Sequence, residues 1–228
     1  MKIENTTLLQ SGWLSRIPPE IATAIIDAGR PKHFSNGDTI YGFDQPQDCL
    51  YGIAKGIVRM WIMMNEQEPR FGHIAGPGFW FGETELVTGK HRIMEMIACG
   101  ESLLHMVDRS TVDRLAKHNT GIWPAVALLA VMNQGTAIGA ADDLLIRDSK
   151  KRLAAVLLRL CQRRNAFQGV THLDRIPITH NELAEASCLS RSATAALLSN
   201  LSASGLISTE YGYISILNAE GLAAIMVG

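Results

Sequence analysis

The chain has 228 residues, of which 47% are hydrophobic and 19% are charged, and its formal net charge is −1. This composition excludes a disordered chain and predicts one large or two small packed domains. The near-neutral charge also excludes a broadly basic surface, so binding to nucleic acid would depend on local basic side chains and on dimerisation. The four cysteines are far apart and include no CxxC pair, which disfavours a zinc ribbon or a cysteine-ligated iron–sulfur cluster and predicts free, mostly buried thiols.

The N-terminal half has the sequence pattern of a small β domain. Its first ten residues are polar and contain no signal-peptide core, which predicts a cytoplasmic protein. A short helix is predicted over residues 14–28, beginning at Pro18 and Pro19. Glycine-rich turns then separate many short β-type runs, a pattern typical of an antiparallel roll. The candidate strands are residues 50–53, 57–62 and 70–74, with one or two more within 94–106.

From residue 110 the pattern becomes helical. A short helix is predicted over residues 110–117 with Ser110 as its N-cap, followed by a long apolar helix over 122–147. The long helix contains helix-weakening and polar residues, so we interpret it as a buried helix and not as a membrane span. Its apolar residues cover more than one face, which predicts contact with the roll on one side and a twin helix on the other; a monomer's central core helix is the alternative. Asp148 suits the N-cap of the next helix, so we place a domain boundary at 147–148.

The segment from residue 178 to residue 216 is the most informative part of the sequence. Thr179 and Glu182 have the spacing of a capping box, and Ser190 suits the N-cap of a further helix. A later pair of β-type runs, 207–210 and 213–216, turns at Tyr211 and Gly212 and predicts a wing. The segment is thus predicted to contain a helix at 181–186, a turn at 187–189 and a second helix at 191–203.

A helix, a three-residue turn and a second helix form a helix-turn-helix, in which the second helix enters the major groove of DNA. Arg191 is the long donor at the start of that helix, so we expect it to contact a guanine or to clamp a phosphate. The residues expected to lie at DNA are Thr179, His180, Ser190, Arg191, Ser192, Thr194 and Ala195.

Three groups of residues together resemble the Crp/Fnr family of bacterial regulators, which includes the cyclic AMP receptor protein. They are Leu183-Ala184-x4-Leu189-Ser190-Arg191-x2-Thr194-x3-Leu198-x2-Leu201-x3-Gly205-Leu206-Ile207, Leu50-Tyr51-x4-Gly56-x-Val58 and Pro77-Gly78-Phe79-Trp80-Phe81-Gly82-Glu83. The resemblance covers nearly the whole chain and implies an α+β fold. It implies a β-roll sensor like a cyclic nucleotide-binding domain (1–121), a central dimerisation helix (122–147) and a winged helix-turn-helix (148–228).

The resemblance implies a homodimeric, sequence-specific transcription regulator whose partners are double-stranded DNA, a second copy of the chain, RNA polymerase and a small-molecule effector, with no membrane. The chain departs from the cyclic AMP receptor protein at Ser192 and Ala196, which replace a Glu and an Arg of the recognition helix. Its DNA target should therefore differ or depend more on DNA shape. Cys188 stands where the turn of the family usually has Gly, which predicts a mildly strained left-handed backbone.

By the same resemblance the effector pocket would contain Gly82, Glu83, Arg92 and Ile93. Ile93 replaces the hydroxyl residue that the family offers to a cyclic phosphate, so we expect an atypical effector site. The identity of the effector stays open between cyclic AMP, which the substitution disfavours, haem, an apolar ligand and no ligand at all. Trp61, Trp80 and Trp123 could line an apolar pocket or could simply pack in the core.

Two other classes of protein compete with a regulator. An enzyme is disfavoured because the sequence has no His-x-His, GxSxG, HExxH or P-loop motif, and no metal site is predicted. A cyclic-nucleotide-fold module that does not bind DNA is the alternative, and the low basicity and Ala196 favour it.

Overall fold

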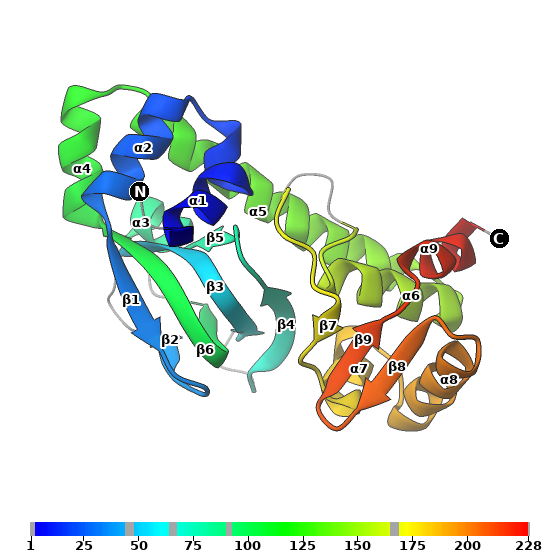
Figure 1. Ribbon diagram of the computed structural model, residues 1–228. Coiled ribbons are helices and arrows are strands. Elements are labelled where there is room, and N and C mark those ends of the chain that lie inside the picture. The colour runs from blue at the N-terminus through cyan, green and yellow to red at the C-terminus, as the bar shows by residue number, and fades with distance from the viewer. Residues whose placement is uncertain (1–2, 44–47, 64–67, 90–92, 165–168, 228) are drawn as a thin grey trace.

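The computed structural model describes residues 3–43, 48–63, 68–89, 93–164 and 169–227. Figure 1 shows a β-roll with its covering helices on one side and a smaller helical unit with a three-stranded sheet on the other. A single long helix, α5 (Ile122–Leu145), runs from one to the other. The remaining helices are α1 (Ile3–Gln10), the short 3-10 helix η1 (Trp13–Arg16), α2 (Pro19–Ala28), α3 (Glu83–Thr88), α4 (Arg109–His118), α6 (Ser149–Leu160), α7 (His180–Ala186), α8 (Arg191–Ala203) and α9 (Ala219–Val227).

The roll is an antiparallel sheet in the order β1-β6-β3-β4, with β2 paired to β6 and β5 paired to β3. The predicted antiparallel roll is therefore confirmed. Its strands are β1 (Arg30–Phe34), β2 (Thr39–Tyr41), β3 (Cys49–Ile62), β4 (Arg70–Ala75), β5 (Trp80–Phe81) and β6 (Met94–Asp108).

The two predicted runs 50–53 and 57–62 belong to one long strand, β3. Its pairing with β6 continues from Cys49 opposite Asp108 to Ile62 opposite Met94, with register shifts on both sides of Lys55. Gly56 follows at φ +93°, a conformation that favours glycine, so the chain bulges there and does not turn. The glycine signal that separated the two runs in the sequence thus marks a β-bulge.

The short helix after β6 begins one residue earlier than its predicted bounds, and its predicted cap is wrong. The N-cap is Asp108, whose Oδ1 accepts a hydrogen bond from the Thr111 backbone N–H at 2.8 Å and from the Ser110 hydroxyl at 2.7 Å. An aspartate at the end of β6 outcompetes Ser110 because its carboxylate accepts both bonds at once. Both bonds lower the pKa of Asp108, and the bond from Ser110 has the larger effect.

One face of α5 is packed on the roll. Its buried residues there include Val126, Leu129 and Met132, and the Trp13 indole N–H donates to the Ala125 carbonyl at 2.7 Å. By length and composition alone α5 is the one helix of the described chain that could cross a membrane. Its contacts with the roll support the predicted reading as a core helix of a folded domain.

The C-terminal half has a core of its own that also receives side chains from the roll. The predicted cap of its first helix, α6, is confirmed, since Asp148 Oδ1 accepts from the Lys151 backbone N–H at 2.8 Å. Its sheet has the order β7-β9-β8 and contains the predicted wing. Phe71 and Ile74 of β4 pack in this core with Leu157 and other residues of α6. The strands are β7 (Arg175–Ile176), β8 (Ile207–Glu210) and β9 (Tyr213–Ile216).

We predict that Gly82, which precedes α3, tolerates no side chain. Its φ is +97°, and a Cβ there would collide with the backbone carbonyl oxygen of Cys49. Gly82→Ala should therefore lower the free energy of unfolding by about 3 kcal/mol or more, from left-handed strain together with overpacking. The measurement is urea-induced unfolding followed by tryptophan fluorescence.

Gly37 provides the matched control, because its φ is +87° and a Cβ there meets no described atom within 4 Å. Gly37→Ala should cost only the strain, about 1 to 2 kcal/mol. Equal destabilisation by the two substitutions would contradict the close approach at Gly82.

Candidate functional site

The first helix of the helix-turn-helix, α7, begins at the predicted capping box. Thr179 Oγ1 accepts a hydrogen bond from the Glu182 backbone N–H at 3.2 Å, and Glu182 Oε2 accepts one from the Thr179 backbone N–H at 2.7 Å. Both halves of the box are present, which confirms the prediction and fixes the residue at which α7 starts.

The second helix, α8, presents one face to solvent and buries the other. Ser190 is its N-cap, with Oγ accepting from the Ala193 backbone N–H at 3.2 Å. Leu198 and Leu201 are buried in the core and hold the helix in place. The exposed residues are Arg191, Ser192, Ala195, Ala196, Ser199 and Asn200, so three of the residues predicted to meet DNA lie together on this face.

Thr194 does not belong to this face. Its side chain is fully buried, and its hydroxyl has no hydrogen-bond partner among the described residues. It lies three residues after Arg191 but on the core-facing side, because the i, i+4, i+7 pattern of Thr194, Leu198 and Leu201 follows the inner stripe of the helix. The expectation that Thr194 lies at DNA is therefore corrected.

Thr179 and His180 are exposed at the start of α7. They line a surface depression together with the wing tip, where Tyr211 is fully exposed. Sequence reasoning missed Arg175 of β7, whose guanidinium lies 3.9 Å from the Tyr213 ring centroid and pairs with Glu210 at 2.6 Å. The sequence did not predict that Arg175 lies beside the wing, because β7 is only two residues long and has no recognisable strand pattern.

Cys188 adopts the left-handed backbone that the sequence predicts. Its φ is +52°, and among the described non-glycine residues only Gln162 shares a positive φ. The side chain is exposed in the turn between α7 and α8. The chain thus accepts a mildly strained residue where glycine would be unstrained.

A polar contact joins the roll to the helix-turn-helix. Arg59 of β3 donates to Glu182 Oε1 at 2.9 Å and to the Pro177 carbonyl at 2.7 Å. Glu182 therefore serves two structures, since its other oxygen completes the capping box with Thr179. The sequence identified the box but gave no sign of Arg59, which is 123 residues away along the chain.

A cavity of about 380 Å³ lies between the roll and α5. Of the predicted effector residues, Glu83 and Ile93 line it, while Gly82 holds the turn before α3 at φ +97°. Arg92 lies outside the described residues. None of the three tryptophans lines the described part of the cavity, and Trp80 is fully buried in the core, so packing accounts for it.

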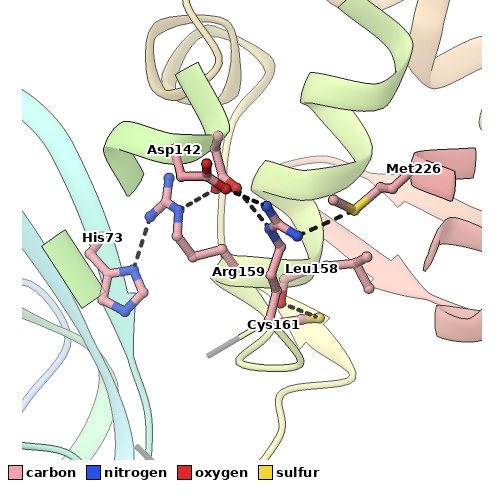
Figure 2. Close-up of polar contacts among 8 residues, drawn as sticks. His73, Asp142, Leu158, Arg159, Cys161 and Met226 are labelled. Atoms are coloured by element: carbon pink, nitrogen blue, oxygen red, sulfur yellow. Dashed lines mark hydrogen bonds and ion pairs between the residues drawn. The ribbon is translucent and has the colours of Figure 1, made fainter. Parts of the chain in front are cut away.

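Two residues of the cavity lining, His73 and Arg159, belong to a buried ionic network, which Figure 2 shows. Arg159 of α6 donates from Nε to Asp143 Oδ2 of α5 at 2.7 Å, and its Nη1 lies 3.3 Å from His73 Nδ1 of β4. Asp143 has no exposed surface, and its Oδ1 accepts from Arg164 Nε at 2.9 Å. Arg164 also bonds Asp142 at 2.8 Å, so the network ties three elements together.

His73 is neutral in this network. Arginine only donates hydrogen bonds, so His73 Nδ1 must accept from Arg159, and the ring proton must be on Nε2. Burial, with the nearby Arg159 charge as the smaller cause, lowers the pKa of His73 from 6.5 to about 3. The imidazole is therefore a fixed acceptor at physiological pH.

The four cysteines are free, as predicted, but only Cys49 and Cys161 are buried. Burial raises the pKa of Cys161 to about 11, which makes it an unreactive thiol. Within the described ranges, no three or more His, Cys, Asp or Glu side chains gather as a potential metal site.

Comparisons with known proteins match both halves of the chain. Residues 31–119 match the cyclic nucleotide-binding domain family, and residues 151–225 match the Crp-like helix-turn-helix domain family. The chain is 28% identical over 193 residues to the transcriptional regulator SdrP of Thermus thermophilus, covering 83% of this chain and 90% of SdrP. It is 23% identical over 199 residues to the nitrogen fixation regulation protein FixK of Bradyrhizobium diazoefficiens, covering 86% and 83%.

Among solved structures, that of FixK2 from Bradyrhizobium japonicum superposes with a TM-score of 0.68 at 18% identity, covering 86% of this chain and 96% of that one. This likeness supports the fold. Together with the two domain matches, it confirms the predicted order of a cyclic nucleotide-binding-like roll followed by a helix-turn-helix.

We predict that His73 makes the fold sensitive to acid. Because the folded protein binds the proton more weakly than the unfolded chain, stability should be complete above pH 6.5 and fall toward pH 3. Between pH 7.5 and pH 5 this histidine should reduce the free energy of unfolding by about 2 kcal/mol. His73→Asn keeps an acceptor near the position of Nδ1 but cannot titrate.

The measurement compares urea unfolding of the two proteins across that pH range. Burial also lowers the pKa of His105, but this histidine is present in both proteins and contributes equally to both curves. The His73→Asn curve should be flatter than that of the wild type by the stated amount. Parallel curves would show that folding does not lower the pKa of His73.

Proposed function

Since the chain belongs to the Crp/Fnr family of transcription regulators, we propose that it binds DNA as a homodimer through the exposed face of α8. The observation that carries this proposal is the position of Arg191. It is exposed at the first turn of a helix that Ser190 caps and that buried leucines fix to the core. A long donor held there on a rigid helix has the reach to contact base edges in a major groove.

The chemistry of this face suggests how it reads DNA. Arg191 is its one charged side chain, while Ser192 offers a hydroxyl and Ala195 offers a methyl group to a thymine. Ser190, Thr179 and His180 are exposed nearby and could contact phosphates. With so few donors, one copy would bind weakly, so the proposal needs two copies on neighbouring half-sites.

The outer face of α5 supplies a surface for pairing two copies. The roll covers the other face, and the exposed apolar residues include Val131, Ile138 and Leu145, with 55%, 62% and 79% of their surface accessible. These three residues are seven positions apart. Further exposed residues lie between and before them, so that the whole set is spaced in alternating steps of three and four, which is the pattern of a two-stranded coiled-coil seam. The exposed seam consists of Pro124, Ala127, Val131, Gln134, Ile138, Ala141 and Leu145.

Paired α5 helices would fix the distance between the two α8 helices. Two recognition helices enter successive major grooves only when they lie about 34 Å apart. We therefore propose three units, with residues 1–121 as sensor, 122–147 as dimerisation helix and 148–228 as DNA-binding unit, and with Asp148 at the hinge. An effector in the cavity beside Glu83 and Ile93, together with Arg92 from the sequence, would shift the population of binding-competent dimers.

The resemblance to the family also supports a cytoplasmic location and RNA polymerase as a further partner. A fold of this kind that does not bind DNA remains the second candidate, because the net charge of −1 gives little general attraction to phosphates. The experiment on Arg191 separates the two candidates.

We predict that Arg191→Ala weakens specific DNA binding at least tenfold while the dimer stays intact. A well-placed arginine contact to a base is worth about 1 to 3 kcal/mol. The measurement is fluorescence anisotropy with DNA from upstream of the protein's own gene, at several salt concentrations. Arg114→Ala is the control, because it removes the same charge from an exposed position of α4 in the roll.

Unchanged specific binding by Arg191→Ala would refute the assigned role of this arginine. Wild-type protein that binds no upstream fragment at any salt concentration would favour the module that does not bind DNA.

We predict that Ile138→Glu converts the dimer to monomers. Two such glutamates would face each other, desolvated, in the seam, and the dimer dissociation constant should rise at least a hundredfold, or about 3 kcal/mol. Sedimentation equilibrium measures this change. Val87→Glu on α3 is the control, since Val87 is a comparably exposed apolar residue (56%, against 62% for Ile138) outside the seam. A dimer that survives Ile138→Glu would place the interface elsewhere.

A further inference from the structure

The cavity between the roll and α5 has a lining suited to an apolar molecule. Its described walls are mostly hydrophobic and include Met60, Phe79, Phe81, Met94 and Ala140. A volume of about 380 Å³ has room for roughly a dozen non-hydrogen atoms, if each occupies about the share of a water molecule in the liquid, ~30 Å³. This is within the size range of small-molecule sites, in which few polar groups orient the ligand.

Arg159 is the one residue of the described lining that comes from the DNA-binding unit. Its hydrogen bonds run from Nε to Asp143 and from Nη1 to His73. Its Nη2 has no hydrogen-bond partner among the described residues, although the side chain is only 4% exposed. The cavity is therefore bounded by a buried guanidinium that still has donors to offer.

The charges around Arg159 allow it to accept a further anion. Asp143 does not depend on Arg159 alone, because its other oxygen accepts from Arg164 at 2.9 Å. If a ligand carboxylate drew Arg159 toward the cavity, Asp143 would retain one cationic partner and would not become an isolated buried charge. Glu83 also lines the cavity, so a carboxylate would orient toward Arg159 and away from Glu83.

We propose that this cavity binds a small, mainly apolar monocarboxylate, with its hydrocarbon part against the roll and α5 and its carboxylate on Arg159. The inference rests on the proposed function, in which this cavity is the effector site, and it adds the chemical class of the effector. The bond that the ligand makes is a charge-assisted hydrogen bond, which is stronger than the bond that a neutral hydroxyl would make to the same nitrogen.

The position of Arg159 also connects the ligand to DNA binding. Arg159 lies on α6, and α6 packs directly against α8 in the C-terminal core. A ligand that changes the bond between Arg159 and Asp143 acts on the junction between α5 and α6. By linkage, DNA and the ligand must then change each other's affinity by the same factor.

Binding of decanoate to the full-length dimer, measured by isothermal titration calorimetry, tests the proposal. Decanoate has about a dozen non-hydrogen atoms, which matches the capacity of the cavity. We expect decanoate to bind at least tenfold more tightly than 1-decanol, which has the same chain without the charge. Arg159→Gln should remove this preference, and Arg159→Lys should retain most of it.

A second variant separates binding from folding of the network. Ala140→Phe fills the cavity from α5 and replaces no residue of the ionic network, and it should abolish decanoate binding. Thermal melting and sedimentation confirm that each variant is a folded dimer. In wild-type protein, saturating decanoate should also change the dissociation constant for DNA at least fivefold, and this change should be absent in Ala140→Phe.

Three results would overturn the proposal even if decanoate binds. They are decanol binding as tightly as decanoate, decanoate binding unchanged in Ala140→Phe, and 3′,5′-cyclic AMP binding more tightly than decanoate. If decanoate fails to bind while Arg191-dependent DNA binding is intact, the ligand class is wrong and the proposed function stands. If decanoate binds as expected but no DNA fragment does, the proposed function fails and the ligand assignment stands.

Discussion

The carboxylate of Asp143 is the interaction on which the arrangement of the two halves depends. It has no contact with solvent, and an isolated buried charge of this kind would be very costly. Arg159 and Arg164, both from the chain that follows the hinge, supply its compensation at 2.7 and 2.9 Å. Because a rearrangement that removed both arginines would leave Asp143 as an isolated buried charge, the angle between α5 and α6 has few alternatives.

This constraint is local, but a shared core extends it. Phe71 and Ile74 of the roll pack among the residues of α6, so the sensor and the DNA-binding unit do not meet only at a linker. The cavity lies beside the same junction, with Arg159 in its wall. If the cavity is the effector site, as proposed above, then sensing and positioning use overlapping sets of side chains, and a change in one has a direct physical route to the other.

The sequence predicted those features that depend on neighbouring residues. The capping box at Thr179, the cap at Asp148 and the wing at 207–216 are local, and each is present. The failures have two causes. Thr194 was predicted to face DNA but is buried, because a polar residue near the start of a helix can lie on either face and its residue type does not show which. Arg59 and His73 were missed because their partners are far away in the chain, and only the fold brings them together.

The double use of Glu182 bears on how such proteins exchange parts in evolution. One carboxylate oxygen closes the cap of the first DNA-binding helix, and the other holds an arginine of the roll. A DNA-binding unit transplanted onto a foreign roll would keep its cap but lose Arg59, which would leave one oxygen of Glu182 without its cationic partner. Exchange of one half alone would therefore break the ion pair between the two halves, and residues 59 and 182 should be inherited as a pair.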